Sequence, residues 1–492
     1  MEPSSTLVLA AIVLLILLAL SRKDSARYAK MPPGPTPLPL IGNILKVNGR
    51  TPHESLVKMS KTYGPVMTVK FGSQPVVVLV GLDAVHEALV QQADVFAGRA
   101  NIPLFMKVTD GTGIGMTNGE CWKQLRRFSM ATLKDFGVGK RSIEDCIREE
   151  AKYLVKEFQK YEGSPCDPMY FLSTAVCNVI CSVVCGERFE YQDENFIELM
   201  SVINTIIYQM STPLAQLYNV FPNILRFLPG PQHIVLQKIK EYQKMVAAIV
   251  EKHMDTVTAG SPRDFIDVYI MKMKQESNNP GTNFTYENLH GTVSNLLMGG
   301  TETTSTTLRY GLLILIKYPH IQGKIQHEID TVIGRERNPA YEDRKKMHYT
   351  EAVIHEIQRF IDLAPVNLMH ATTKDTIFRG YTIPSGTAVI PLLHSCLFDS
   401  KHWETPYSFN PNHFLDENGC FKMNPAFLPF SAGKRVCLGE GLARMELFLF
   451  FTILLQNLSF RSIVKLAEIN LSPDESSFVK LPRPYNFLVY PR

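Results

Sequence analysis

The sequence carries little net charge and none of the patterns that mark nucleic-acid-binding proteins. Its 492 residues include 51 Lys and Arg against 47 Asp and Glu, a formal net charge of +4. It contains no helix–turn–helix, zinc-finger or aromatic RNA-binding pattern, so a nucleic-acid partner is not expected. Repeats and low-complexity stretches are also absent, and no alternation of strands and helices suggests a parallel sheet.

Cysteines are too few and too widely spaced for a disulfide framework. There are nine, an odd number, which suits a body that faces the reducing cytosol. Cys177, Cys181 and Cys185 recur every four residues and therefore fall on one face of a helix. A metal site there would need ligands from a second side, and none is evident. We expect three small, buried, apolar side chains.

The one long apolar run lies at the N-terminus. The 19 residues 3–21 carry no charge, and residues 7–20 are continuously apolar. As a helix they span roughly 28 Å, close to the ~30 Å hydrocarbon core of a bilayer. A cleavable signal peptide is the alternative, but basic residues follow the run, at 22–30, instead of preceding it. We expect an uncleaved, single-pass transmembrane anchor at residues 1–21, with the rest of the chain in the cytosol.

A stiff linker is expected after the anchor. Residues 22–39 are basic at first and then rich in proline, whose fixed φ favours an extended strap. The remaining residues, 40–492, are expected to form the functional domain.

That domain is expected to be mainly α with a minor β part. Residues 66–71 and 76–80 predict an early β-hairpin, and β-like pieces return at 376–383 and near the C-terminus. Helical periodicity dominates elsewhere, most clearly at residues 143–161, 171–185, 232–258, 319–333 and 349–360.

One predicted helix is unusually long. No proline interrupts the chain between Pro280 and Pro319, and apolar residues recur at three- and four-residue steps. Its middle reads GGTETT, starting at Gly299 and Gly300. Each glycine costs about 1 kcal/mol against alanine, and hydroxyls can bend a helix by bonding its carbonyls. The pattern leaves close packing and a functional groove equally open.

The segment most indicative of function is FSAGKRVCLG, residues 430–439, followed by a helical run. Cys437 lies beside Lys434 and Arg435 and just before a helix N-terminus, where a thiolate is favoured. Backbone N–H groups of such a glycine-bounded loop can point at the sulfur, as a thiolate ligand of haem iron requires. A lone cysteine before a helix is usually structural, but this spacing is far more specific.

With this loop the sequence resembles a cytochrome P450 from residue 32 to residue 492, and most of all the vertebrate microsomal family 2 enzymes. The resemblance implies the P450 fold with its long central helix, haem b as cofactor and Cys437 as the iron ligand. The family's acid–threonine motif is matched by Gly300, Glu302 and Thr303, with Gly299 where alanine is usual. The resemblance implies that Glu302 and Thr303 deliver protons. The departure at Gly299 would loosen the helix and widen the pocket.

Other site residues follow from the same resemblance. Trp122 and Arg126 match the family's Trp-x-x-x-Arg, and Arg435, Arg99 and His370 match further contacts to the haem propionates. The pattern Glu-x-x-Arg is matched by Glu356 and Arg359, which with His413 are expected to be structural. Four positions that line the pocket in related enzymes give an apolar site: Phe105, Leu297, Ala364 and Phe478.

The implied activity is monooxygenation of a lipophilic substrate, such as a xenobiotic, fatty acid or steroid, at the endoplasmic reticulum membrane. Electrons would come from NADPH through a flavoprotein reductase, with cytochrome b5 as a second possible donor. A basic face for such acidic partners is expected from Lys123, Arg127, Lys134, Lys140 and Lys434.

Three rival functions remain open: a peroxide-rearranging isomerase, a haem-based sensor and a membrane scaffold without catalysis. Glu302 and Thr303 argue against the first two, which need no proton relay. The Cys437 loop argues against the third.

Overall fold

The computed structural model describes residues 30–136, 143–258 and 260–492. The predicted anchor at residues 1–21 and the first part of the linker lie outside these ranges. Within them, no helix combines the length and the apolar character needed to cross a membrane.

The described chain divides into two compact units. Unit 1 contains residues 30–100 together with Val366–Ser395. Unit 2 contains Asn101–Pro365 together with Cys396–Arg492. The prediction of a mainly helical fold with small sheets is confirmed, since unit 2 holds most of the helices and unit 1 holds the largest sheet.

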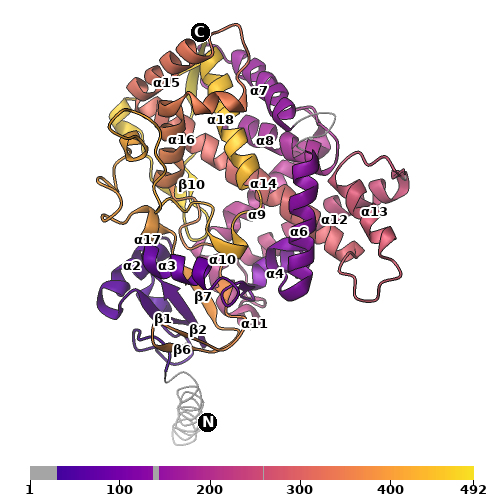
Figure 1. Ribbon diagram of the computed structural model, residues 1–492, viewed down its shortest axis with the longest axis vertical. Coiled ribbons are helices and arrows are strands. Elements are labelled where there is room, and N and C mark those ends of the chain that lie inside the picture. Colours follow the sequence, from indigo (N-terminus) through magenta and orange to yellow (C-terminus); the bar gives the residue numbers. More distant parts are fainter. Residues whose placement is uncertain (1–29, 137–142, 259) are drawn as a thin grey trace, which may run out of the picture. The chain divides into compact units, whose positions relative to one another are not determined.

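Unit 1 is built on a five-stranded sheet with the order β1–β2–β7–β4–β3 (Figure 1). The predicted hairpin is confirmed, with β1 and β2 antiparallel, and β5 pairs with β6 in a second hairpin. One pair, β2 with β7, is parallel, although about 300 residues separate its strands. The strands are β1 Val66–Phe71, β2 Gln74–Leu79, β3 Gly98–Arg99, β4 His370–Ala371, β5 Thr376–Phe378, β6 Tyr381–Ile383 and β7 Ala388–Pro391.

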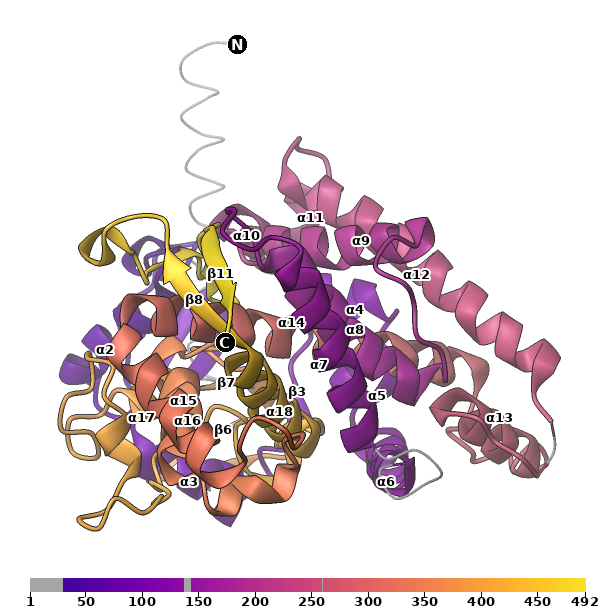
Figure 2. The ribbon, with the colours of Figure 1, turned by 90° about the horizontal axis from the view of Figure 1, so that it is seen from above.

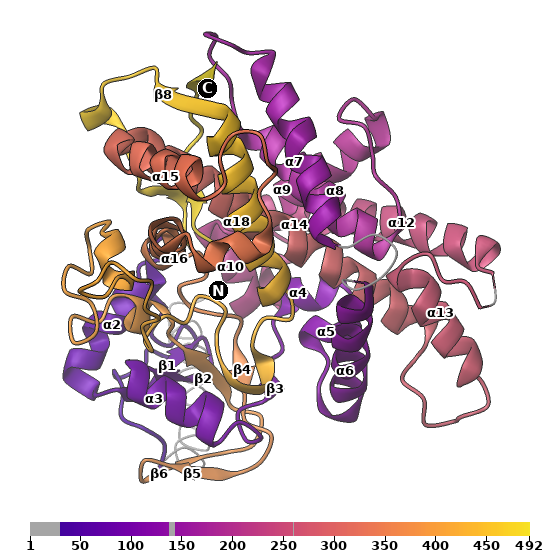
Figure 3. The ribbon, with the colours of Figure 1, turned by 45° about the horizontal axis from the view of Figure 1, so that its top comes forward.

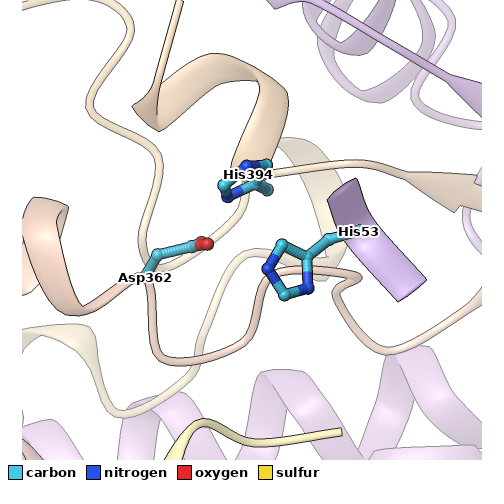
Figure 4. Close-up of side chains that lie close together, drawn as sticks. All are labelled: His53, Asp362 and His394. Atoms are coloured by element: carbon cyan, nitrogen blue, oxygen red, sulfur yellow. The ribbon is translucent and has the colours of Figure 1, made fainter. Parts of the chain in front are cut away.

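Short helices and the proline strap complete unit 1. Thr68 of β1 donates its N–H to Pro33 O at 2.9 Å, so the strap is fixed to the sheet. The ring of His53 meets that of His394 edge to face, with centroids 4.6 Å apart (Figure 4). The helices that start in unit 1 are η1 Ile44–Lys46, α2 Pro52–Tyr63, α3 Leu82–His86, η2 Glu87–Gln91 and α17 His394–Leu397.

Unit 2 contains all of the predicted long helices. The helices of unit 2 are α4 Pro103–Val108, α5 Gly113–Met116, α6 Gly119–Phe136, α7 Ile143–Gln159, α8 Met169–Val184, α9 Glu194–Met210, α10 Pro213–Val220, α11 Pro222–Leu225, α12 Pro231–Thr256, α13 Phe265–Gln275, α14 Tyr286–Lys317, α15 Pro319–Val332, α16 His348–Ile361 and α18 Glu440–Asn457. Its short 3-10 turns are η3 Tyr341–Lys345, η4 Pro411–Phe414, η5 Gly433–Arg435 and η6 Leu466–Glu468. Two strand pairs join them, β8 Leu458–Ser462 with β11 Phe487–Pro491 (Figure 2), and β9 Pro473–Glu475 with β10 Leu481–Pro482.

Helix α14 is the long central helix that the sequence predicted. Thr285 caps its start by accepting the N–H of Asn288, and Pro319 follows its end. Most of its 32 residues are buried, because α5, α8, α16 and α18 all pack against it (Figure 1). Helix α18 in turn packs against α7 (Figure 3).

Glycines allow these neighbours to approach α14 closely. A Cβ added to Gly311 would lie 2.1 Å from Phe451 Cζ of α18, and one on Gly300 would lie 3.0 Å from Ile180 of α8. At Gly299, in contrast, no atom lies within 4 Å of the position of an added Cβ. Of the two central glycines, Gly300 therefore serves packing and Gly299 faces open space.

The three cysteines in and directly after α8 are buried, as predicted. Cys177, Cys181 and Cys185 are buried in an apolar cluster with residues of α9, α12 and α14. Their role is packing.

The Glu356–Arg359–His413 group is a fully buried structural cluster. Arg359 donates to both carboxylate oxygens of Glu356, at 2.7 and 2.8 Å, and to the carbonyls of Leu397 and Pro406. His413 Nδ1 lies 3.1 Å from Glu356 Oε2. The cluster therefore joins α16 to the chain around residues 397–413.

We expect Arg359→Ala to lower the free energy of unfolding by roughly 3–5 kcal/mol, because it leaves the Glu356 carboxylate buried without its cation. Urea denaturation followed by circular dichroism measures the change. The control is Lys345→Ala, whose ion pair with Glu342 is 63% and 75% exposed and should change stability by less than about 1 kcal/mol. Equal effects of the two substitutions would contradict the structural role of the cluster.

Candidate active site

The Cys437 loop is a tight turn that leads directly into α18. Val436 N–H donates to Gly433 O at 3.1 Å, and Cys437 N–H donates to Phe430 O at 3.0 Å. Ser431 and Gly433 have φ values of 64° and 71°, which form the turn. These bonds fix the backbone on either side of the sulfur.

The local electrostatics do not by themselves produce a thiolate. Burial raises the pKa of the Cys437 thiol, and this outweighs the backbone N–H groups of Gly439 and Glu440 and the charge of Arg126, which lower it. Burial therefore outweighs the groups of the loop that favour the thiolate, and the thiolate at Cys437 stays a prediction. A bound metal cation would supply the remaining stabilisation, because coordination deprotonates a thiol.

The surroundings of Cys437 fit a ligand that enters from one side. Cys437 is exposed, although the surrounding protein partly desolvates its sulfur. On α14, which is otherwise mostly buried, Gly299 and Thr303 are exposed as well. They are four residues apart and share one face of the helix.

Two cations lie next to the Cys437 loop, the half-buried Arg126 and the buried Arg435. Arg126 of α6 donates to Val436 O at 2.6 Å, and no carboxylate of the described residues lies within 4.0 Å of its guanidinium. Arg435 is 5% exposed, donates to Thr117 O at 2.7 Å and stacks 3.8 Å from the ring centre of Trp122. Sequestered guanidinium groups beside an accessible cysteine are a donor set that suits a haem, which carries carboxylates.

Arg99 and His370 lie in unit 1, where they are cross-strand partners in the β3–β4 pair. Arg99 Nη1 donates to Leu368 O at 2.7 Å, and His370 Nδ1 lies 2.7 Å from Phe96 O. Arg99 and His370 therefore lie next to each other. Their assignment to the haem propionates stays a prediction.

Glu302 and Thr303 are adjacent in sequence but differ in environment. Thr303 is exposed and its hydroxyl donates to Gly299 O at 2.8 Å. Glu302 is buried and accepts from the Thr306 hydroxyl at 3.1 Å, and its Oε2 has no hydrogen-bond partner among the described residues. Burial raises the pKa of Glu302 against the opposing effects of Arg309 and Thr306, which favours the protonated acid.

The sequence reasoning did not identify Glu446. It is a fully buried carboxyl in the apolar run of α18, and burial raises its pKa well above the usual value despite a hydrogen bond with Thr304 of α14. The available signal was an acidic residue inside the run MELFLFF.

Two of the four predicted pocket residues meet directly. The rings of Phe105 on α4 and Phe478 before β10 lie edge to face, with centroids 4.8 Å apart. Ala364 is half-buried just after α16. Leu297 is fully buried in the apolar cluster around α8 and α12, so its side chain offers no surface to a ligand here.

Two residues that adjoin Leu297 and Ala364 in sequence pack against the same buried cluster as Phe478. Met298 and Leu363 are half-buried and pack with Phe478 around the buried residues Ile207 and Val479. A shift of one position on a helix turns a side chain by about 100°, which explains why Met298 and not Leu297 has this orientation.

The predicted basic face is described in part. Lys123, Arg127 and Lys134 are exposed on α6, and Lys434 is exposed in the Cys437 loop. Lys140 lies outside the described residues. Lys123 forms an ion pair with Glu120 at 2.6 Å.

Comparison with known proteins agrees with this geometry. The sequence model of the cytochrome P450 family matches residues 32–489. The chain is 49% identical to cytochrome P450 2C20 of Macaca fascicularis over 491 residues and 48% identical to cytochrome P450 2C8 of Homo sapiens over 491 residues, covering 100% of each chain. It is 49% identical to cytochrome P450 2F2 of Mus musculus over 463 residues, covering 94% of each.

The similarity extends over the whole length of vertebrate family 2 proteins and includes the Cys437 loop. The family uses haem iron with a cysteine thiolate ligand and carries out monooxygenation. The chain therefore belongs to the cytochrome P450 family, as a haem-thiolate protein of the family 2 type.

Proposed function

We propose that this chain is a membrane-anchored monooxygenase that inserts one oxygen atom of O2 into a lipophilic xenobiotic, fatty acid or steroid, with electrons from NADPH. The observation that carries the proposal is the exposed face of α14 at Gly299 and Thr303, together with the accessible Cys437 in the same unit. A hydroxyl on an open helix face can supply a mobile proton. An oxygenase needs such a proton, and a haem sensor does not.

Cys437, Arg126, Arg435 and Trp122 would hold the haem. When bound, the haem supplies oxygen activation at its iron, which the thiolate ligand promotes. Arg126 and Arg435 offer guanidinium groups to the propionates, and the Trp122 ring orients Arg435 by stacking on it. Arg99 and His370 are proposed as further propionate contacts.

Proton delivery is assigned to Thr303 and Glu302. The Thr303 hydroxyl now bonds its own helix, and rotation about its side-chain bond would present Oγ1 to the open side of α14. Burial raises the pKa of Glu302 and so favours its protonated form, which would exchange its proton through the Thr306 hydroxyl that donates to it. The two side chains would then act in sequence, joined by water.

Phe105, Phe478 and Ala364 would orient an apolar substrate, with Met298 and Leu363 beside Phe478. Leu297 would contribute only if α14 turned. The apolar lining supports a lipophilic substrate and favours no single class among the three.

We further propose that residues 1–21 anchor the protein in the endoplasmic reticulum membrane, with the catalytic body in the cytosol. The exposed bases of α6 and Lys434 would receive an acidic flavoprotein reductase or cytochrome b5.

We expect Cys437→Ala to abolish the red-shifted Soret band of the reduced protein under carbon monoxide, because that band requires a thiolate on the iron. The matched control is Cys420→Ala, which removes another exposed cysteine and should leave the band at full height. A Cys437→Ala protein that kept the band would contradict the assignment of the ligand.

We expect Thr303→Ala to divert electrons from product to peroxide, because a proton would no longer arrive on time. Product formed per NADPH consumed should fall, by up to about a hundredfold if no water substitutes for the hydroxyl. Parallel assays of product, NADPH and peroxide measure the change.

Two variants control for this experiment. Thr303→Ser keeps a hydroxyl and should restore most of the coupling. Thr331→Ala removes a hydroxyl with the same backbone bond, 2.9 Å to His327 O, from exposed α15 and should change nothing. An unchanged product ratio in Thr303→Ala would place the proton path elsewhere. A wild type that consumed no NADPH with reductase and any lipophilic substrate would favour the isomerase or the sensor.

A further inference from the structure

Phe478 lies at the tip of a five-residue hairpin loop, residues 476–480, between β9 and β10. Its ring meets that of Phe105, and Phe478 packs, as do Met298 and Leu363, against the buried cluster of Ile207, Val479 and Leu481. A loop tip usually moves more than the elements that it joins. Whatever fixes residues 476–480 therefore also fixes the position of the Phe478 ring.

One side of the loop is bonded to Ser211, which follows α9. Ser477 N–H donates to Ser211 O at 3.1 Å, and Val479 N–H donates to Ser211 Oγ at 3.4 Å. Ser211 is itself fully buried and its hydroxyl donates to Ile207 O at 2.9 Å. These bonds hold the backbone on both sides of Phe478.

The other side of the loop is bonded to the end of α16. Lys480 N–H donates to Leu363 O at 2.9 Å, and Lys480 Nζ donates to Asp362 Oδ2 at 2.7 Å. The side chains of Lys480 and Asp362 are only 11% and 1% exposed. The Lys480 ammonium also lies 5.7 Å from the centre of the Phe398 ring.

A sequestered ion pair is a costly way to stabilise a loop, since apolar residues of the same volume usually serve as well or better. What it adds is a fixed geometry, because a charged hydrogen bond is satisfied at one separation and angle. Here Lys480 is two residues from Phe478. A fixed position of Lys480 therefore restricts the backbone, and with it the position of the Phe478 ring.

We propose that the Lys480–Asp362 ion pair, together with Ser211, positions Phe478 in the substrate pocket and thereby determines which carbon of the substrate is oxidised. Lys480 and Asp362 are positioning residues, since they act through Phe478. The proposal rests on the proposed monooxygenase function for its effect on products, but the fixation of the loop does not depend on turnover.

The test compares Lys480→Met, which keeps an unbranched side chain but removes the charge, with Lys480→Arg, which keeps the charge. The matched control is Lys345→Met, at an ion pair that is exposed to solvent. The first readout is hydrogen exchange of the amides of Ser477, Val479 and Lys480. We expect exchange about tenfold faster in Lys480→Met, with wild-type rates in the two other variants.

The second readout is the ratio of products from a lipophilic substrate with two oxidisable carbons, assayed with reductase and NADPH. We expect this ratio to change by about threefold or more in Lys480→Met, with total turnover within about twofold, because a small displacement of the substrate redirects oxidation. Lys480→Arg should restore the wild-type ratio. If Lys480→Met does not fold, the double variant Lys480→Met with Asp362→Asn removes both charges and is measured in the same way.

Wild-type exchange and a wild-type product ratio in Lys480→Met would overturn the proposal. Faster exchange with an unchanged ratio would also overturn it, because the loop would then move without any effect on selectivity. A wild type without turnover would overturn the monooxygenase function, while the exchange rates would still decide whether the ion pair fixes the loop.

Discussion

The active site depends on a constraint on helix α14, which must be buried along most of its 32 residues and yet leave one patch open. Glycines meet the first demand, since Gly291 and Gly311 let α5 and α18 approach within distances that a methyl group would forbid, and Gly300 lets α8 pack tightly. Gly299 and Thr303 meet the second. Because the neighbours of α14 fix its rotation, they also decide that Thr303 faces open space while Glu302 is buried.

Packing in unit 2 also determines where charged side chains lie and how the pKa values of its acidic groups shift. Arg126 and Arg435 are kept beside the Cys437 loop by hydrogen bonds to backbone carbonyls, without a carboxylate within salt-bridge distance of Arg126 among the described residues. Burial raises the pKa of Cys437 and also those of Glu302 and Glu446. Protein groups alone therefore leave cations near the loop and favour the protonated forms of the two acids near α14. A negatively charged cofactor with a positive metal centre complements both the cations and the thiol.

Much of the fold could be predicted from the sequence, because local patterns specify it. Alternating residues predicted the β1–β2 hairpin, and periodicity with an absence of proline predicted α14. The parallel pairing of β2 with β7 could not be predicted, because it joins strands that are far apart in sequence and carries no local signal. Gly299 and Gly300 were also indistinguishable by sequence, since only the packing of α8 separates their roles.

In the site, the sequence identified Cys437, Arg126, Trp122 and Arg435, and the structure places these four close together. It was harder to predict which of two adjacent helical side chains points toward the pocket. Leu297 is fully buried, whereas its neighbour Met298 is half-buried. Glu446 was overlooked because a glutamate within an apolar helix has no meaning until its neighbour Thr304 is known.

The central claim is that the Cys437 sulfur ligates haem iron. X-ray absorption at the iron edge of the purified, haem-loaded protein tests it most directly, because sulfur and nitrogen scatter differently. We predict one sulfur atom in the first coordination shell of the wild type and none in Cys437→Ser. Nitrogen and oxygen ligands alone in the wild type, or a sulfur ligand that persists in Cys437→Ser, would contradict the account.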